Sequence, residues 1–377
     1  MSETTPDREA VMAASPFNDP GKMSSPERVS AALAGRSVDR VPLQAGHSFA
    51  GEFRERWARA KGLPECTMRE IDEYYGGDVV EIAADHTPWP TGARKVEETD
   101  EHVIEIDGFG GTRETIKGKP FWLPLAYALE DKSKLGEVDF DAPELDSRYD
   151  GLLRGAEASR GRYYAYVKVG GPYSRSKWMR GEEQFLIDMI EDPPFVKALV
   201  DRVADHMTAV GLESVRRAGL DETAIHVHDD MASLDRMFFS PAAFDEFLFE
   251  PYRRMCEAFH AAGLRVFYGG EGNISEVFGR FLDAGIDGFI CLELRAGMDM
   301  VELREKYGPE PVFFGNICNT VTLPSGDRER IRAEVARQME VARRGRCVVG
   351  PSHLVGADVT IESYEWMIEA IREWGAA

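Results

Sequence analysis

The sequence is poor in cysteine, and it has neither a long apolar run nor an excess of basic residues. Its five cysteines are widely spaced and form no Cys-x-x-Cys pair, which argues against a disulfide framework and a thiolate zinc cluster. No stretch approaches the roughly 18 apolar residues that a membrane span needs. The formal net charge of −21 disfavours nucleic acid and anionic membranes as partners. These absences favour a cytoplasmic protein with reduced thiols.

Two parts of the chain are expected to differ in order. Residues 1–24 lack the basic start and apolar core of a signal peptide, and they predict a flexible tail. Residues 25–377 alternate short apolar runs with helical patterns, and continuous apolar runs are typical of parallel strands that are buried on both faces. We expect a first strand that begins at 40–43, and further strands at 78–84, 163–169, 223–227, 264–268, 288–292, 312–315 and 347–350.

One stretch, about 87–150, interrupts this alternation. Its segment HVIEIDGFGGTRETIKG alternates apolar and polar residues around glycines, which predicts a β-hairpin. The sequence therefore predicts an α/β fold: a single (β/α)8 TIM-barrel domain over 25–377, with an N-terminal helical extension and a β-hairpin insertion after strand 2.

Ionisable or amide side chains follow nearly every predicted strand. In (β/α)8 barrels the active site lies at the C-terminal ends of the strands, so these residues predict an enzyme pocket there. The expected substrate-binding residues are His47, Asp85, His86, Tyr173, Glu293 and Asn316.

Glu271, His353, His228 and Asp230 are the expected catalytic residues. Glu271 stands between two glycines, which let a ligand approach the backbone closely. Carboxylates and imidazoles at such places can transfer protons or bind a metal. His228 and Asp230 share a face of their strand pattern, whereas we expect His226 to be a satisfied interior residue. Structural roles stay open: Glu271 could pair with an arginine, and His353 could bond to the backbone.

Several segments occur in the order of a known family. They are SPERVSAALAGRSVDRVPL, SPAAFDEFLFEPYRRMCEAFHAAG, GNISEVFGRFLDAGIDGF, LRAGMDMVELREKYG, FFGNI and VVGPSH. With these segments the chain resembles the uroporphyrinogen decarboxylase superfamily over residues 25–375. The Pro-x-Trp-x-Met-Arg-Gln-Ala-Gly-Arg signature of true uroporphyrinogen decarboxylases is absent, and the equivalent stretch reads RVPLQAGHSFAGEF. The resemblance is closer to the corrinoid-dependent methyltransferase branch.

That branch implies a methyl transfer from a small methylated donor, of methoxy or methylamine type, to a corrinoid protein. Its zinc-dependent members carry His-x-Cys-Gly after strand 5 and a cysteine after strand 8. This chain has Gly269-Gly270-Glu271-Gly272 and His353 there, so both thiolates are missing. Glu271, His353 and His228 could still hold Zn²⁺. The corrinoid would come from a separate protein, and the resemblance implies a homodimer.

The sequence also leaves two alternatives open. The chain could be a cofactor-free decarboxylase or lyase acting on a small carboxylated substrate, with Asp230 or Asp85 stabilising a developing charge. It could also be a barrel that only binds a ligand or serves as a scaffold.

Overall fold

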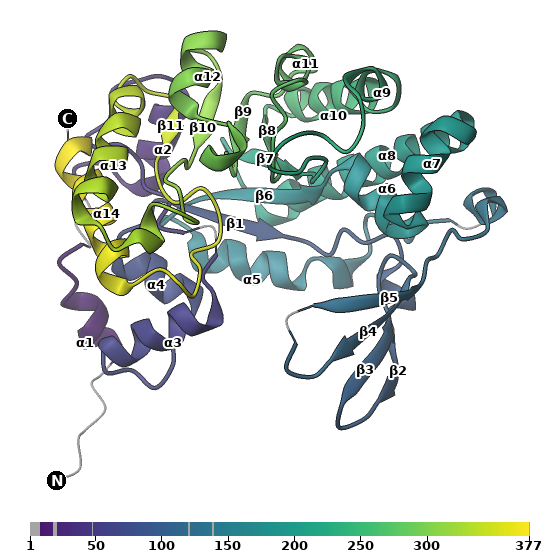
Figure 1. The fold of residues 1–377 in the computed structure, drawn as a ribbon, viewed down its shortest axis with the longest axis horizontal. Helices are drawn as coiled ribbons and strands as arrows, with labels where there is room; N and C mark the ends of the chain where they lie inside the picture. Colours follow the sequence, from purple (N-terminus) through teal and green to yellow (C-terminus); the bar gives the residue numbers. More distant parts are fainter. Residues whose placement is uncertain (1–7, 18–20, 47, 120, 138, 377) are drawn as a thin grey trace.

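Seven parallel strands form the central sheet of the computed structural model, which describes residues 8–17, 21–46, 48–119, 121–137 and 139–376. Each strand lies beside the next one in chain order, and the sheet curls like part of a barrel wall (Figure 1). Their bounds are β1 Val79–Ala83, β6 Tyr164–Gly170, β7 Ala224–His228, β8 Arg265–Gly269, β9 Gly288–Ile290, β10 Val312–Phe314 and β11 Cys347–Val348. All seven coincide with predicted strands, so the α/β fold with a parallel, TIM-like sheet is confirmed.

The predicted first strand, residues 40–43, is wrong as a regular strand. Leu43 forms one parallel bridge to Val349 beyond β11, and its carbonyl accepts a hydrogen bond from the N–H of Asp78 before β1. The N–H of Leu43 donates to the Asp78 carboxylate at 2.8 Å instead of joining a ladder. Within the described residues, the segment therefore spans the seam between the two edge strands without closing an eight-stranded barrel.

Helices surround the sheet and follow its strands (Figure 1). None of the described helices is long and apolar enough to cross a membrane. The α-helices are α1 Arg8–Ala13, α2 Ser25–Leu33, α3 Gly51–Ala60, α4 Met68–Tyr74, α5 Asp150–Ser159, α6 Pro172–Arg180, α7 Glu182–Glu191, α8 Pro193–Ala218, α9 Pro241–Phe247, α10 Phe249–Ala261, α11 Phe278–Asp283, α12 Met300–Tyr307, α13 Arg328–Ala342 and α14 Ile361–Gly375. Short 3-10 turns are η1 Pro90–Gly92, η2 Lys132–Gly136, η3 Asp146–Arg148, η4 Leu294–Ala296 and η5 Leu323–Ser325.

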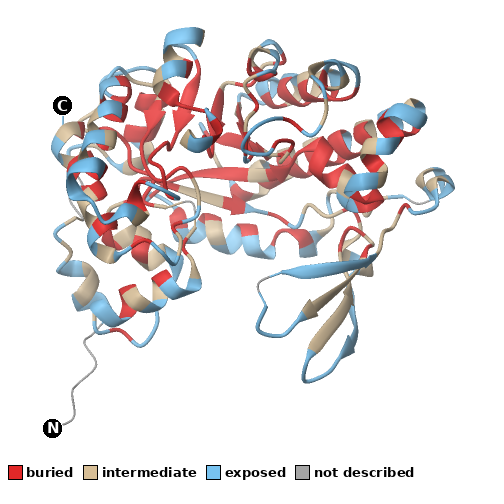
Figure 2. Ribbon diagram, viewed as in Figure 1, coloured by how far each residue is buried: buried red, intermediate tan, exposed pale blue. Residues whose placement is uncertain are grey.

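The insertion after β1 is larger than the predicted hairpin. The hairpin exists as β3 His102–Ile106 and β4 Thr112–Ile116, and β2 Arg94–Glu98 and β5 Trp122–Ala126 extend it to a four-stranded antiparallel sheet. This sheet projects from the body of the molecule, and its residues are exposed or half-buried (Figure 2). We call it the arm.

The two faces of the central sheet bury different side chains. Side chains such as Ile82, Val167 and Val227 belong to the large core shared with the helices. The opposite, inner face carries a smaller apolar cluster that includes Tyr166, Phe267 and Phe314, together with Val29 and Leu33 of α2. Because successive residues of a strand alternate between faces, every second residue counted from a member of the smaller cluster also lies on the inner face.

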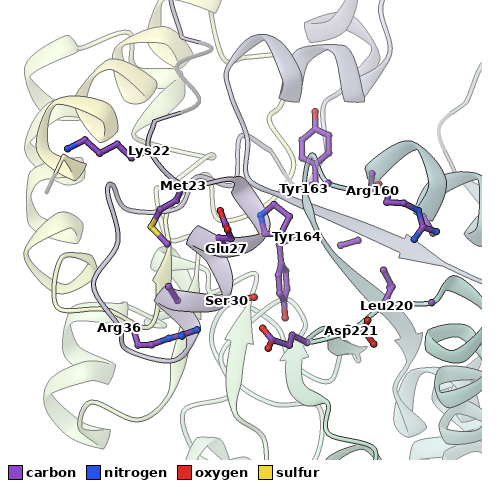
Figure 3. A pocket seen from close by; sticks show the side chains of 18 residues that line it. Lys22, Met23, Glu27, Ser30, Arg36, Arg160, Tyr163, Tyr164, Leu220 and Asp221 are labelled. Carbon is purple, nitrogen blue, oxygen red and sulfur yellow. The ribbon is translucent and has the colours of Figure 1, made fainter.

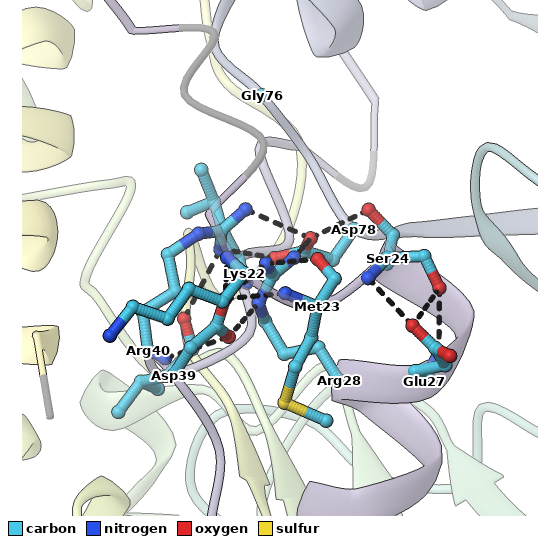
Figure 4. Close-up of polar contacts among 12 residues, drawn as sticks. Lys22, Met23, Ser24, Glu27, Arg28, Asp39, Arg40, Gly76 and Asp78 are labelled. Carbon is cyan, nitrogen blue, oxygen red and sulfur yellow. Dashed lines mark hydrogen bonds and ion pairs between the residues drawn. The ribbon is translucent and has the colours of Figure 1, made fainter.

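A buried ionic cluster fastens α2 and the 40–43 segment to the start of β1 (Figure 4). Ser24 and Glu27 form a capping box that begins α2, a device that satisfies two orphan N–H groups. Further along α2, Arg28 donates to the carboxylates of Asp39 and Asp78, both at 2.7 Å. Arg40 also pairs with Asp78. Within the first 24 residues, α1 lies against α4; the flexibility of the 1–24 tail remains a prediction.

Candidate active site

Four titratable side chains line the inner face of the sheet toward the C-terminal ends of β1, β6 and β7. Alternation places Glu81, Lys168, His226 and His228 there. Glu81 connects Lys168 and His226, because its Oε1 lies 3.3 Å from Lys168 Nζ and its Oε2 lies 2.6 Å from His226 Nδ1. The rings of His226 and His228 are 5.7 Å apart. Three neighbouring strands thus carry one continuous polar cluster.

Burial favours the neutral form of both histidines of this cluster. It lowers the pKa of His226, and the hydrogen-bonded carboxylate of Glu81 offsets only part of that effect. It lowers the pKa of His228 to about 2, and the Lys168 ammonium acts in the same direction. His226 is the interior, hydrogen-bonded residue that the sequence predicted. His228, whose side chain is 17% exposed, is a neutral imidazole at the mouth of the curled sheet.

The four predicted catalytic residues form a line across this mouth. His228 Nε2 lies 3.9 Å from Asp230 Oδ1, and the same oxygen accepts a hydrogen bond from the N–H of Glu271 at 3.0 Å. Glu271 Oε1 in turn lies 3.1 Å from His353 Nε2. Glu293 is close enough that the Glu271 carboxylate adds to the effect of burial in raising its pKa. The loops after β7, β8, β9 and β11 therefore meet at one acidic site.

Two predicted substrate-binding residues are held in the structure by other contacts. The Asn316 amide donates to the carbonyls of Leu292 and Met298 and is fully buried. Tyr173 is fully buried as well, and its ring packs against Phe239 with centroids 5.0 Å apart.

The predicted residues after β1 take different positions. Asp85 is exposed and caps its own turn by accepting hydrogen bonds from Thr87. His86 is half-buried, and burial and the charge of Arg175 hold its pKa well below the usual range. His47 lies outside the described residues.

Glu81, Lys168 and Arg175 are candidate functional residues that the sequence reading missed. The predicted site residues stand beyond the strand ends, whereas Glu81 and Lys168 lie within β1 and β6. A signal was present: a charged residue inside an otherwise apolar strand must face either a partner or a site. Arg175 follows β6 on α6, and no strand pattern reaches it.

The described residues do not fit the expected zinc site. Glu271 and His353 contact each other directly, and no three histidine, cysteine, aspartate or glutamate side chains of the described residues gather as a metal ligand set. Catalytic zinc sites use three protein ligands. The five cysteines are all buried free thiols, so no accessible thiolate supplements the pair.

A cavity of about 770 Å³ lies at the opposite end of the sheet. It is lined by residues of α2, the start of β6 and the turn before β7, including Glu27, Tyr163, Tyr164 and Asp221 (Figure 3). These residues lie at the N-terminal ends of the strands. In (β/α)8 barrels that face contributes to stability, and the active site lies at the opposite face. The mouth with Glu271 and His353 is therefore the better candidate active site.

Comparison with known proteins agrees with this placement of the fold. A methyltransferase from Methanosarcina mazei shares 18% sequence identity with the chain at a TM-score of 0.64, over 93% of this chain and 99% of that chain. A B12-independent methionine synthase from a Shewanella species shares 11% identity at a TM-score of 0.41, over 76% of this chain and 74% of that chain; this likeness is too weak to carry an argument. The first likeness shows the shared fold.

Sequence comparison gives the family. No curated protein matches the chain. The sequence profile described as uroporphyrinogen decarboxylase matches residues 105–374, which is most of the chain and includes all strands from β4 to β11. The chain therefore belongs to the uroporphyrinogen decarboxylase family.

Proposed function

We propose that this protein is a methyltransferase that passes a methyl group from a small methylated donor to a corrinoid protein. Family membership, a fold shared with a methyltransferase of Methanosarcina mazei and the chemistry of the mouth support this. The observation that carries the proposal is the Glu271–His353 pair at 3.1 Å, in the two places where a thiol-activating relative would carry cysteines. A proton-transfer pair suits demethylation of a donor better than activation of a thiol.

The residues of the mouth have one chemical task in this reaction. The reduced cobalt of the corrinoid supplies the nucleophile that accepts the methyl group. The bond from the methyl carbon to the donor oxygen or nitrogen breaks, and the leaving atom retains the electron pair. A proton delivered from the Glu271–His353 pair makes that atom a better leaving group. Asp230 fixes the Glu271 backbone through its 3.0 Å hydrogen bond and so positions the pair.

Removing the acid tests the proposal. The assay follows the conversion of cob(I)alamin to methylcobalamin by absorbance, with panels of methoxylated and N-methylated donors. Glu271→Gln and His353→Asn should each slow transfer by about 10²- to 10⁴-fold, the usual contribution of a general acid. Glu276→Gln, an exposed glutamate in the same loop region, is the matched control and should match the parent. Equal rates in all four proteins would refute the role of the pair, and no transfer from any donor would refute the function.

Zinc content is a separate measurement. Because the described residues do not supply three ligands, no step above uses zinc. Plasma mass spectrometry on protein purified without chelator tests the zinc prediction. About one zinc per chain, lost in Glu271→Gln, would mean that the ligands assemble in a way that the described residues do not show.

A cofactor-free decarboxylase or lyase is the second candidate. The observation that favours it is the Lys168 ammonium on the inner face, beside neutral histidines, because a cation there can bind a carboxylate or stabilise a developing negative charge. This reading predicts turnover of a carboxylated substrate without cobalt, and release of carbon dioxide distinguishes it.

The arm exposes apolar side chains that suit contact with a protein partner. Strand β5 and its approach expose Phe121, Trp122, Leu123 and Leu125, with Phe121 59% exposed. Exposed apolar patches of this kind are typical of protein contacts. We place the proposed homodimer contact on the arm and the corrinoid protein at the mouth. Light scattering should give twice the chain mass, and the mass should fall to that of one chain in Leu123→Lys/Leu125→Lys.

A further inference from the structure

Arg175 is a buried cation without a hydrogen-bonding partner. The residue is 4% exposed, and its Nε has no acceptor. Within the described part of the chain, none of its nitrogens forms a hydrogen bond or an ion pair. Its Cζ lies over two aromatic rings, 4.2 Å from the ring centroid of Trp178 and 5.9 Å from that of Phe109. Ring faces attract the guanidinium plane but leave its in-plane N–H groups without acceptors. The residue therefore holds donors that nothing in the fold uses.

The structure places these donors at the mouth. Gly170, the last residue of β6, lies two positions after Lys168 and so shares the inner face. A Cβ at Gly170 would lie 2.1 Å from Arg175 Nε, so the arginine side chain occupies the space above this glycine. Arg175 thus lies over the inner face beyond Lys168, and only glycine at 170 admits it there.

The buried carboxylate of Asp229, whose charge acts on Arg175, already has its own hydrogen-bonding partners. Asp229 accepts hydrogen bonds from the N–H groups of Tyr173 and Ser174, at 3.0 and 2.6 Å, and from the Tyr252 hydroxyl at 2.7 Å. Burial lowers the pKa of Arg175, and the charges of Asp229 and Asp230 offset only part of that effect. A buried charge without a partner opposes folding, so a structural role does not account for an arginine at this position.

Two more unsatisfied polar atoms flank Arg175 on neighbouring strands. Nδ1 of His86, after β1, and Nδ1 of His228, at the end of β7, are both buried without a hydrogen-bonding partner. Strands β1, β6 and β7 are adjacent in the sheet, and the Arg175 charge acts on both imidazoles. This part of the mouth is rich in donors, whereas Glu271 follows β8, one strand further along the sheet.

We propose that Arg175 binds a carboxylate group of the substrate, and that the methyl donor is therefore a small methylated carboxylic acid. This deepens the proposed function and rests on it. A carboxylate accepts two parallel N–H bonds from a guanidinium, a geometry that gives both strength and orientation. With its carboxylate on Arg175, the donor directs its methylated atom away from the cationic side, toward Glu271 and His353.

Binding to matched ligand pairs tests this inference without any cobalt. Titration calorimetry on the full chain at constant ionic strength compares methoxyacetate with methoxyacetamide, and 3-methoxybenzoate with 3-methoxybenzamide. At least one carboxylate should bind about 10- to 100-fold more tightly than its neutral amide, the range of a charge-assisted bond. Arg175→Met should abolish this preference and leave the amide affinity unchanged. Arg59→Met, at an exposed arginine of α3, should leave both affinities as in the parent.

The result that overturns the inference is equally definite. A parent without preference for either carboxylate, or a preference that survives in Arg175→Met, excludes the site. The melting temperature of Arg175→Met should equal or exceed that of the parent, because an unpaired buried charge is removed; if the variant fails to fold, Arg175→Lys provides the comparison, with a weakened but retained preference.

Failure of the inference can be told apart from failure of the proposed function. A carboxylate preference that depends on Arg175, with no methyl transfer from any donor, supports the site and refutes the methyltransferase. Methyl transfer from carboxylate donors that Arg175→Met leaves unchanged supports the methyltransferase and refutes the site.

Discussion

Replacing Asp78 with asparagine should destabilise the fold more than any surface substitution. The Asp78 side chain is fully buried and accepts hydrogen bonds from Arg28 Nη1 at 2.7 Å and Arg40 Nη1 at 2.5 Å (Figure 4). It also accepts hydrogen bonds from the Leu43 N–H and the Ser25 hydroxyl, both at 2.8 Å. It therefore connects α2, the seam segment and β1 through one carboxylate. Asparagine keeps the shape and removes the charge.

The expected loss of stability in Asp78→Asn depends on the arginine charges that remain without this carboxylate. Breaking a buried ion pair from one side typically costs about 3–5 kcal/mol, because the partner charge remains buried. Arg28 has 1% of its side chain exposed, but Asp39 still pairs with it. Arg40 can reach solvent with 12% of its side chain. The retained partner and this access favour the lower end, about 3 kcal/mol.

Urea unfolding monitored by circular dichroism measures the change in the free energy of unfolding. Glu369→Gln is the control, since it removes the exposed pair of Glu369 with Arg328, and such a pair contributes less than about 1 kcal/mol. A loss below about 1 kcal/mol in Asp78→Asn, no larger than in the control, would refute the view that this cluster fastens the seam.

Three further outcomes follow from the structure. Burial acts to raise the pKa of Asp39, but the Arg28 hydrogen bond and backbone N–H groups outweigh it and hold the pKa below its ordinary value. The ionised Asp39 therefore stabilises the fold above about pH 4, and this stabilisation is lost as the pH falls through the lower folded pKa. Asp39→Asn should lessen the dependence of the free energy of unfolding on pH between pH 4 and 2. All five cysteines are buried, and burial raises the pKa of Cys256 to about 12; native protein should therefore react negligibly with Ellman's reagent, and five thiols should react in guanidinium. Gly170→Ala places a methyl group where the Arg175 side chain lies, so it should remove the carboxylate preference in calorimetry; an unchanged preference would contradict the placement of Arg175.

Seven of the eight strands were predictable because each is a short apolar run with a turn signal behind it. The eighth was not, because a side chain competes with the ladder. Leu43 donates its N–H to Asp78, so the 40–43 segment loses a ladder hydrogen bond to an ionic cluster that no apolar pattern reveals. The arm exceeded the prediction for a related reason. Strand β2 has every residue exposed, and β5 contains Pro124, so neither shows the alternation of a half-buried strand.

The acidic line at the mouth was predictable because strand-end residues of parallel strands meet at one edge. Glu271, His353, Asp230 and His228 follow three different strands, and the structure brings them into one line. Position at a strand end does not decide what a side chain contacts. Asn316 also follows a predicted strand, but its amide donates hydrogen bonds to two backbone carbonyls. Only the path of the following loop decides between these fates.

The cationic side of the mouth depends on what keeps opposite charges apart. If the Arg175 guanidinium could reach Asp230 or Glu271, an ion pair would form and neither group would be left for a substrate. Gly170 gives the arginine its place on the β6 side, and Trp178 and Phe109 hold its plane there. Rigid packing around unpaired groups is how a site stays ready for a ligand. In the proposed reaction, this separation orients the donor, with its acid end on β6 and its methylated end over the Glu271–His353 pair.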